Sequence, residues 1–172
     1  MNLIFRLIRV LVTAFFRDRL SLLDESTLEF RVWPTDLDVN FHMNNARYLS
    51  MMDLGRLDLL VRAGLFATLM KQRWQPVVGS ATIRYRRSLK PFQKYRLCSR
   101  IVGWDHKWFY LEQRFEVGDT LVASAVVKGL LRGSERYVPT AELLDSAGHD
   151  PESLPEPAAF VAALRRVGKE PG

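Results

Sequence analysis

The feature of this sequence that most constrains its fold is one long apolar helix followed by four consecutive strands. Residues 46–64 predict the helix, because Asn44 or Asn45 can cap its start and Gly64 can stand just past its end. Apolar side chains cover most of its circumference, so it needs neighbours on several sides. The strands are predicted at 77–88, 95–104, 108–117 and 121–132, with turns at 105–107 and 118–119. A strongly curved antiparallel sheet can wrap such a helix, so we expect an α+β fold.

The remaining segments divide the chain into three parts. Residues 1–22 predict an N-terminal amphipathic helix, and residues 23–138 form the central domain, which opens with a strand at 28–33 and carries a short helix at 65–73. Residues 139–172 are richer in acid and proline, which indicates a loosely attached tail with one short helix near 158–167. A chain of 172 residues fits this single-domain plan.

The N-terminal helix has one polar stripe on an otherwise apolar surface. Asn2, Arg6, Arg9, Thr13 and Arg17 recur at spacings of three and four residues. Two placements follow from this pattern. The helix lies in a membrane interface with its arginines at the lipid phosphates, or it packs on the domain or on a partner subunit. The arginines also interrupt the apolar run, so neither a bilayer span nor a signal peptide is expected.

Composition narrows the chemistry. The chain has one cysteine, Cys98, which excludes an intramolecular disulfide and favours a reducing compartment, the cytoplasm. The three histidines lie far apart in sequence, so no metal site and no cofactor is expected. The net charge of +6 is concentrated in residues 71–107, which hold +9, and in residues 1–20, which hold +3. No nucleic-acid-binding motif accompanies this charge, so an anionic small molecule or an acidic protein is the expected partner.

Residues 35–45 are the segment most suited to chemistry. Asp38, Asn40 and His42 are spaced by two residues, so an extended backbone would point all three side chains to one side. They precede a helix N-terminus, where free N–H groups collect. A carboxylate beside such donors can activate water and hold a developing oxyanion. The alternative is a turn rich in Asp and Asn that only caps the helix.

The segment Thr35-Asp-Leu-Asp-Val-Asn-Phe-His-Met-Asn-Asn-Ala-Arg-Tyr48 resembles the signature of the hotdog-fold acyl thioesterases, which include 4-hydroxybenzoyl-CoA and acyl-ACP thioesterases. Further matching blocks are Tyr85-Arg-Arg-Ser-Leu89, Gly103-Trp-Asp105 and Phe109-Tyr-Leu-Glu112. The resemblance is nearest to thioesterase superfamily member six and its bacterial relatives, and it covers residues 28–135. It implies a hotdog fold, in which a curved antiparallel sheet wraps one long central helix.

The resemblance also implies a homodimer, or a dimer of dimers, with active sites between subunits. The family's catalytic carboxylate falls on Asp38, and the asparagine and histidine of its acyl-ACP branch fall on Asn40 and His42. The backbone donors at the helix start would come from Met43, Asn44 and Asn45.

This sequence departs from the acyl-ACP branch at Ser88 and Leu89, where that branch has an acidic residue and a cysteine. A related lineage places its carboxylate inside the helix, and Asp53 is the candidate for that role. Asp53 could equally be a helix residue paired with Arg56 at i+3.

The expected function is hydrolysis of an acyl-CoA or acyl-ACP thioester, with Asp38 as general base or nucleophile. The phosphates of CoA or the acidic surface of a carrier protein would be attracted by Arg84, Arg86, Arg87 and Lys90, of which Arg84 and Arg86 are expected on one strand face. The competing hypothesis is a hotdog protein that binds acyl groups or lipids without turnover, held at a membrane by residues 1–20.

Overall fold

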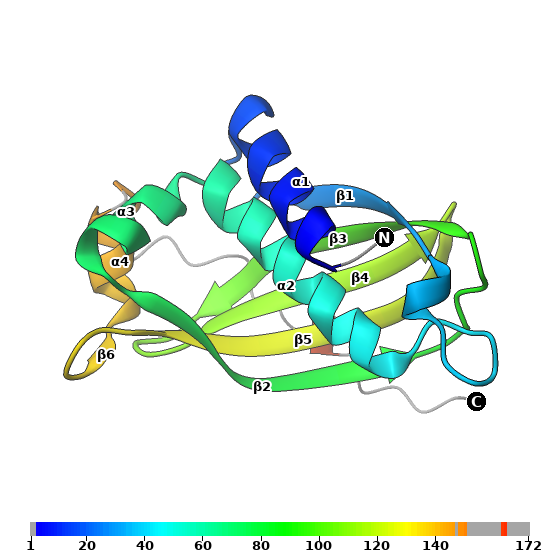
Figure 1. Cartoon of the computed structure of the whole chain (residues 1–172). Helices are drawn as coiled ribbons and strands as arrows, with labels where there is room; N and C mark the ends of the chain where they lie inside the picture. The colour runs from blue at the N-terminus through cyan, green and yellow to red at the C-terminus, as the bar shows by residue number, and fades with distance from the viewer. Residues whose placement is uncertain (1–2, 147, 151–162, 165–172) are drawn as a thin grey trace.

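A curved antiparallel sheet packs against one long helix in the computed structural model, which describes residues 3–146, 148–150 and 163–164 (Figure 1). The sheet has the order β1-β3-β4-β5-β2, and β6 pairs with β5. The strands are β1 (Ser26–Arg31), β2 (Gln75–Tyr85), β3 (Lys94–Trp104), β4 (Phe109–Val117), β5 (Thr120–Arg132) and β6 (Tyr137–Val138). The four consecutive strands predicted from the sequence are confirmed. Gly118, at φ +57°, lies in the two-residue turn that joins β4 to β5.

The central helix, α2 (Asn45–Arg62), lies across the inner face of the sheet. Asn44 caps it, since its side chain accepts a hydrogen bond of 2.8 Å from the Ala46 N–H. Gly64, in the left-handed region at φ +75°, separates it from α3 (Leu65–Gln72). The caps that the sequence predicted are therefore the ones that set its ends. Its inward side joins the core with fully buried side chains that include Tyr48, Met51 and Met52.

β2 is the last strand in the order of this sheet. Within the part of the chain that the structure describes, β2 pairs with β5 on one side only, and most of its residues are exposed. An unpaired strand edge of eleven residues is a ready surface for pairing with another chain. A bulge at Gly79 interrupts the β2–β5 register, and the Trp108 ring lies so close there that a Cβ at position 79 would be 2.4 Å from it.

The segment directly after Val138 is more regular than the sequence indicated. Residues Thr140–Ser146 form α4, whose Leu143 and Leu144 side chains are buried against Leu59, Leu65 and their neighbours. The prediction of a loose tail is wrong here, because this apolar pair in a short helix closes the end of the core. The helix expected near 158–167 lies outside the described residues, apart from 163–164, where Ala163 is buried against Val102 and Val126.

The N-terminal helix, α1 (Leu3–Phe16), packs on α2 and reaches β1 through Arg9, whose exposed guanidinium donates to the Glu29 carbonyl. Arg6 is only 1% exposed and forms an ion pair with the buried Asp36, with Nη2 2.5 Å from Oδ2. Arg6 therefore points into the domain, and Arg9 and Arg17, although more exposed, are bonded to it, whereas one of the two expected placements required the arginines to face lipid phosphates. The other placement, packing on the domain, is confirmed. Among the described residues, no helix is both long and apolar enough to cross a membrane.

Candidate functional site

The loop that carries Asp38 is a closed turn rather than an extended segment. A bridge between Leu37 and Met43 closes it, and the Asp38 N–H donates to the His42 carbonyl at 2.8 Å. Phe41 adopts φ +57° inside the turn. The expectation of an extended backbone is therefore wrong, and a period of two does not align the three side chains. The loop lies at the opposite end of the sheet from α3 and α4 (Figure 1).

The Asp38 carboxylate organises this turn. Its Oδ1 accepts hydrogen bonds from the backbone N–H groups of Asn40, at 2.9 Å, and of His42, at 3.2 Å. Asp38 is half-buried, and its Oδ2 accepts no hydrogen bond in the part of the chain that the structure describes. One oxygen is thus fixed by the backbone, and the other keeps its lone pairs for a water molecule or a substrate.

The side chains of Asn40 and His42 do not contact the carboxylate through hydrogen bonds within the described ranges. Asn40 is exposed and His42 is half-buried. Both residues serve Asp38 through their backbone N–H groups instead. The structure brings the three residues into one turn, but it does not assemble them into a hydrogen-bonded catalytic triad.

Of the three backbone N–H groups expected to stabilise an oxyanion at the start of α2, one is available in this structure. The Met43 N–H donates to the Leu89 carbonyl at 2.9 Å, and the Asn44 N–H donates to the Asp36 carbonyl at 2.8 Å. These two N–H groups are therefore already used, and the assignment of Met43 and Asn44 as donors is wrong for this conformation. Asn45 is the first residue of α2, and within the described chain its N–H has no protein acceptor, as is usual for the first turn of a helix.

The buried Asp36 holds the Asp38 loop in place, a role that the sequence did not reveal. Its carboxylate accepts hydrogen bonds from the Trp33 N–H, at 2.9 Å, and from the Arg6 guanidinium. Its carbonyl holds the Asn44 N–H. The turn is therefore tied to α1 through Arg6. The sequence signals were one arginine of the helix stripe and an aspartate two residues after Pro34, which share no spacing rule because they are thirty residues apart.

The basic segment after β2 lies against the same helix start. Tyr85 Oη donates to the Asn45 carbonyl at 3.3 Å, and the Leu89 carbonyl holds Met43. Arg84 is half-buried near the end of β2, and the exposed Arg86, Arg87 and Lys90 follow it. Since β2 ends at Tyr85, Arg84 and Arg86 do not share a strand face as expected. The four cations nevertheless follow one short segment beside the start of α2.

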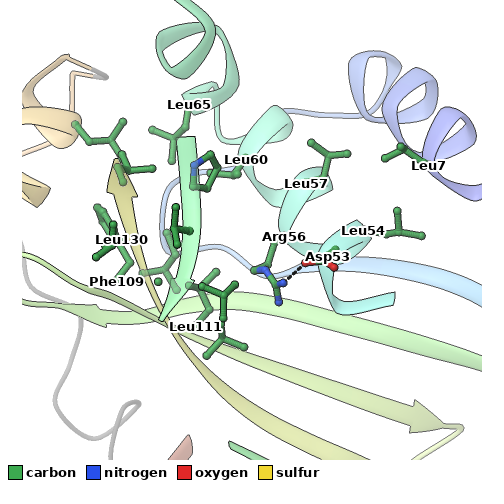
Figure 2. Close-up of a pocket in the computed structure, with 18 residues that line it drawn as sticks. Leu7, Asp53, Leu54, Arg56, Leu57, Leu60, Leu65, Phe109, Leu111 and Leu130 are labelled. Carbon is green, nitrogen blue, oxygen red and sulfur yellow. Dashed lines mark hydrogen bonds and ion pairs between the residues drawn. The ribbon is translucent and has the colours of Figure 1, made fainter. Parts of the chain in front are cut away.

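A cavity of about 330 Å³ lies between α2 and the inner face of the sheet (Figure 2). Its walls are almost entirely apolar and include Leu57, Leu60, Phe109, Leu111 and Leu130. Of the expected site residues, Asp53 lines it, whereas Asp38, Asn40 and His42 do not. A single chain therefore keeps the Asp38 turn apart from its own apolar cavity.

The polar edge of this cavity is a chain of hydrogen bonds that starts at Asp53. Asp53 is paired with Arg56, as the i+3 alternative predicted, and Arg56 Nη1 donates to the buried Gln113 at 2.7 Å. Gln113 donates in turn to Ser99 at 2.9 Å. Burial lowers the pKa of Arg56, and Asp53 opposes that effect. Asp53 is thus engaged by an arginine, although its side chain is 69% exposed.

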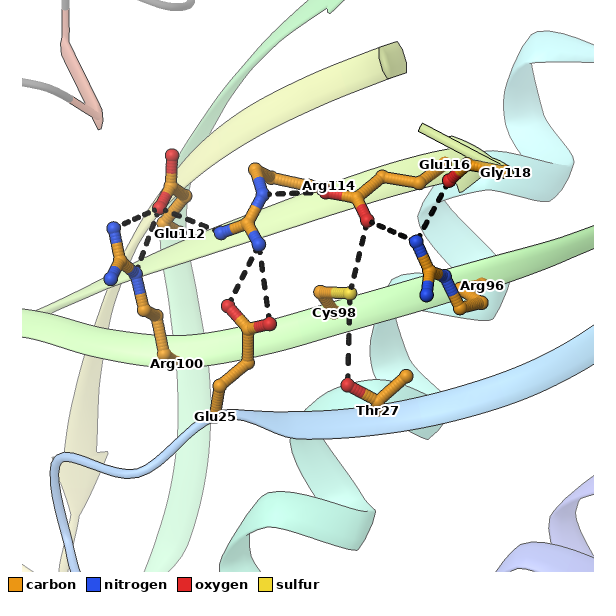
Figure 3. A network of polar contacts seen from close by, with 9 residues as sticks. All are labelled: Glu25, Thr27, Arg96, Cys98, Arg100, Glu112, Arg114, Glu116 and Gly118. Atoms are coloured by element: carbon orange, nitrogen blue, oxygen red, sulfur yellow. Dashed lines mark hydrogen bonds and ion pairs between the residues drawn. The ribbon is translucent and has the colours of Figure 1, made fainter. Parts of the chain in front are cut away.

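Charged residues on the outer face of the sheet form a separate network (Figure 3). Glu112 is 1% exposed and pairs with Arg100 and Arg114. Cys98 lies beside this network with its Sγ 3.7 Å from Glu116, and burial raises the pKa of its thiol to about 11. A thiol held protonated in this way is a core residue rather than a nucleophile. The described residues contain no group of three His, Cys, Asp or Glu side chains that could hold a metal ion.

The chain is similar in sequence to a known protein family and to several curated proteins. A family model described as Thioesterase-like superfamily matches residues 32–161. The zebrafish (Danio rerio) Protein THEM6 is 42% identical over 121 residues, which cover 69% of this chain and 60% of that protein. The chain thus spans little more than half the length of such relatives.

Two solved structures share the fold. The YbaW probable thioesterase from Escherichia coli matches with a TM-score of 0.66 at 23% identity, over 70% of this chain and 94% of that chain. A DHNA-CoA thioesterase from Staphylococcus aureus matches with a TM-score of 0.64 at 14% identity, over 86% and 97%. The hotdog architecture that the sequence resemblance implied is therefore confirmed.

Proposed function

We propose that this chain, which belongs to the thioesterase-like superfamily, hydrolyses an acyl thioester of coenzyme A or of acyl carrier protein. The observation that carries the proposal is the state of the Asp38 carboxylate. Two backbone N–H groups fix Oδ1, and no protein donor of the described chain occupies Oδ2. This carboxylate stands on the turn that leads directly into α2, where helix N–H groups favour a developing negative charge.

In the proposed reaction, Asp38 Oδ2 takes a proton from a water molecule as the water oxygen attacks the thioester carbonyl carbon. The carbonyl oxygen gains the negative charge and is stabilised by the Asn45 N–H. The C–S bond then breaks, and the thiolate leaves with the proton that Asp38 received. Direct attack by Asp38 through an anhydride is the alternative route to the same products. Asn40, the most exposed of the three polar residues, positions the water or the carbonyl, and His42 assists proton transfer.

The proposed active unit is a homodimer, because the single chain separates the Asp38 turn from the apolar cavity. The exposed edge of β2 is the surface through which two copies would pair. Pairing would place the turn of one subunit against the cavity of its partner, and the acyl group would occupy that cavity. Asp53, at the edge of the cavity, is the alternative carboxylate.

The proposed substrate is an acyl-CoA. Arg84, Arg86, Arg87 and Lys90 lie on the segment bonded to the start of α2, where the phosphates of a CoA would meet them. The structural neighbour from Staphylococcus aureus is described as acting on a CoA thioester, which supports this choice. Acyl carrier protein is the second donor that the same cations would attract. We place the reaction in the cytoplasm, where the free thiol of Cys98 is stable.

A second candidate function is acyl binding without turnover. It is favoured by the structural use of Asp38, because a carboxylate that caps a turn would be retained even in a protein that does no chemistry.

Thiol release from acyl-CoAs of increasing chain length separates these functions. Asp38→Asn keeps an oxygen that can accept the Asn40 and His42 hydrogen bonds, but it cannot take a proton, so kcat should fall by about 10²–10⁴-fold with the fold retained. The matched variant Asp53→Asn should keep kcat within a few-fold. The reverse result moves the base to Asp53. Saturable acyl-CoA binding with no thiol release by the wild type establishes the binding function instead.

A further inference from the structure

A surface helix of a globular protein usually turns its apolar side to the core and its charged side to water. In α1 the arginines are instead bonded to the domain. Arg6 reaches Asp36, Arg9 Nη2 donates to the Glu29 carbonyl at 2.9 Å, and Arg17 Nη1 lies 3.3 Å from the buried Asp58 carboxylate. All three arginines of the helix stripe are therefore held by the domain. Most of the surface that α1 exposes to its surroundings is apolar, with Arg9 and Thr13 along one border.

We call this apolar side the outer face of α1. It consists of Ile4, Phe5, Ile8, Val12, Phe15 and Phe16, and Phe16 is 87% exposed. Full burial of side chains of this size is worth about 1.5–3 kcal/mol each, so leaving all of them in water is costly. Contiguous exposed apolar surface of this kind marks an interaction site.

The chemistry of the outer face indicates an alkyl partner. Its side chains are aliphatic or phenyl and carry no hydrogen-bonding group. Thr13, which borders the face, uses its hydroxyl to donate to the Arg9 carbonyl at 2.8 Å. Protein interfaces typically carry about one hydrogen bond per 100–200 Å² and are rich in Tyr, Trp and Arg, which this surface lacks. The acyl region of a lipid bilayer requires neither polar partners nor charge.

The outer face also continues into the cavity. Leu7, 37% exposed on α1, lines the cavity together with Leu54 and Leu57 of α2 (Figure 2). Apolar surface thus continues from the exposed side of α1 to the walls of the cavity. Those walls are apolar as well, so they could also contact alkyl chains.

We propose that α1 docks the protein on a lipid bilayer by shallow insertion of its outer face, with the Leu7 side of the cavity turned toward the lipid. The apolar side chains make the contact, and the arginines stay with the domain. Interfacial helices bury their apolar face about 5–10 Å deep, which the exposed side chains of the outer face can reach. This docking concerns the surface alone and does not require the proposed hydrolysis.

The test is flotation of the full chain with vesicles of pure phosphatidylcholine at 0.5 M NaCl, where exposed charges are screened. The wild type should float, and adding phosphatidylglycerol should change the bound fraction by less than about twofold. The double variant Ile8→Gln/Phe16→Gln should lose roughly tenfold or more of its partition coefficient. Phe92→Gln, at an exposed phenylalanine that does not belong to α1, is the matched control and should bind as the wild type does.

Circular dichroism and light scattering complete the experiment. The double variant should keep the wild-type spectrum and the wild-type mass, because Ile8 is 53% and Phe16 is 87% exposed. No flotation with neutral vesicles, or flotation only with phosphatidylglycerol, overturns the proposal. A double variant that floats normally but has a lower mass in solution also overturns it and assigns the face to contact between copies of this chain.

Discussion

The guanidinium of Arg6 and the carboxylate of Asp36 form a buried ion pair, 2.5 Å apart at Nη2 and Oδ2, with both side chains 2% exposed. This pair joins the N-terminal helix to the loop that presents Asp38. Removing Arg6 leaves the buried Asp36 with only the longer contact to the half-exposed Arg47, whose Nε lies 3.7 Å from Oδ1, so Arg6→Met should lower the free energy of unfolding by about 3 kcal/mol. Urea unfolding monitored by circular dichroism measures this change.

The double variant Arg6→Met/Asp36→Leu is the control for that prediction. Replacement of both charges by apolar groups removes the unpaired ion, so it should recover a large part of the loss. A double variant as unstable as the sum of the single variants would show that the two side chains act independently.

A close approach between α2 and the sheet leads to the second prediction. A Cβ at Gly55 would lie 2.5 Å from Ser99 Oγ and 3.0 Å from Gln113 Nε2. Gly55→Ala should therefore push the helix off these residues and cost about 1–3 kcal/mol of stability, despite the better helix propensity of alanine. Thermal unfolding checks it, with Gly103→Ala as the control, since nothing lies within 4 Å of a Cβ there.

The parts of the fold that follow local rules were predictable. Asn44 and Gly64 gave the ends of α2, and Gly118-Asp119 gave the β4–β5 turn, because caps and tight turns depend on a few neighbouring residues. The resemblance to a known signature gave the wrapping of the sheet. The Arg6–Asp36 pair was not predictable, since it depends on where two distant segments meet.

In the candidate site, too, the features set by neighbouring residues were predictable and those set by tertiary contacts were not. The Asp-rich loop was located correctly from its residues, but its conformation was not. An alternation of polar residues looks the same in an extended segment and in a closed turn, and here the Asp38 side chain stabilises the turn. The use of Met43 and Asn44 N–H groups by Leu89 and Asp36 is likewise a tertiary property.

Alkaline pH supplies the third prediction. Burial raises the pKa of Cys98 to about 11 from its usual value of 9.0, so the unfolded chain loses this proton first. Stability from this group is therefore complete below pH 9 and declines as the pH rises toward 11, by about 1–3 kcal/mol. Urea unfolding at pH 8 and pH 11 should show a smaller pH-dependent loss for Cys98→Ala than for the wild type. An identical loss in both proteins would contradict the assigned cause.

The basic segment supplies the fourth prediction. If Arg87 and Lys90 attract the phosphates of CoA, Arg87→Ala/Lys90→Ala should raise KM by about 3–10-fold at low salt with little change in kcat. The difference should shrink at 0.5 M NaCl, because these side chains are exposed and their charges are screened. Steady-state kinetics at both salt concentrations measures it. Arg132→Ala, on an exposed arginine at the far end of β5, controls for net charge, and an equal effect there would remove the assignment.

The exposed edge of β2 supplies the last prediction. Val78 is 46% exposed beside the Gly79 bulge, and a lysine at this position should oppose pairing between two copies of the strand. Val78→Lys should therefore shift the mass measured by light scattering from dimer toward monomer, and kcat/KM should fall in parallel as the concentration is lowered. Leu23→Lys, at a similarly exposed leucine outside the sheet, should leave both unchanged. Since Val78 also lines the cavity, activity lost by a variant that stays dimeric would assign the effect to the cavity. A fully active wild-type monomer would contradict the shared site.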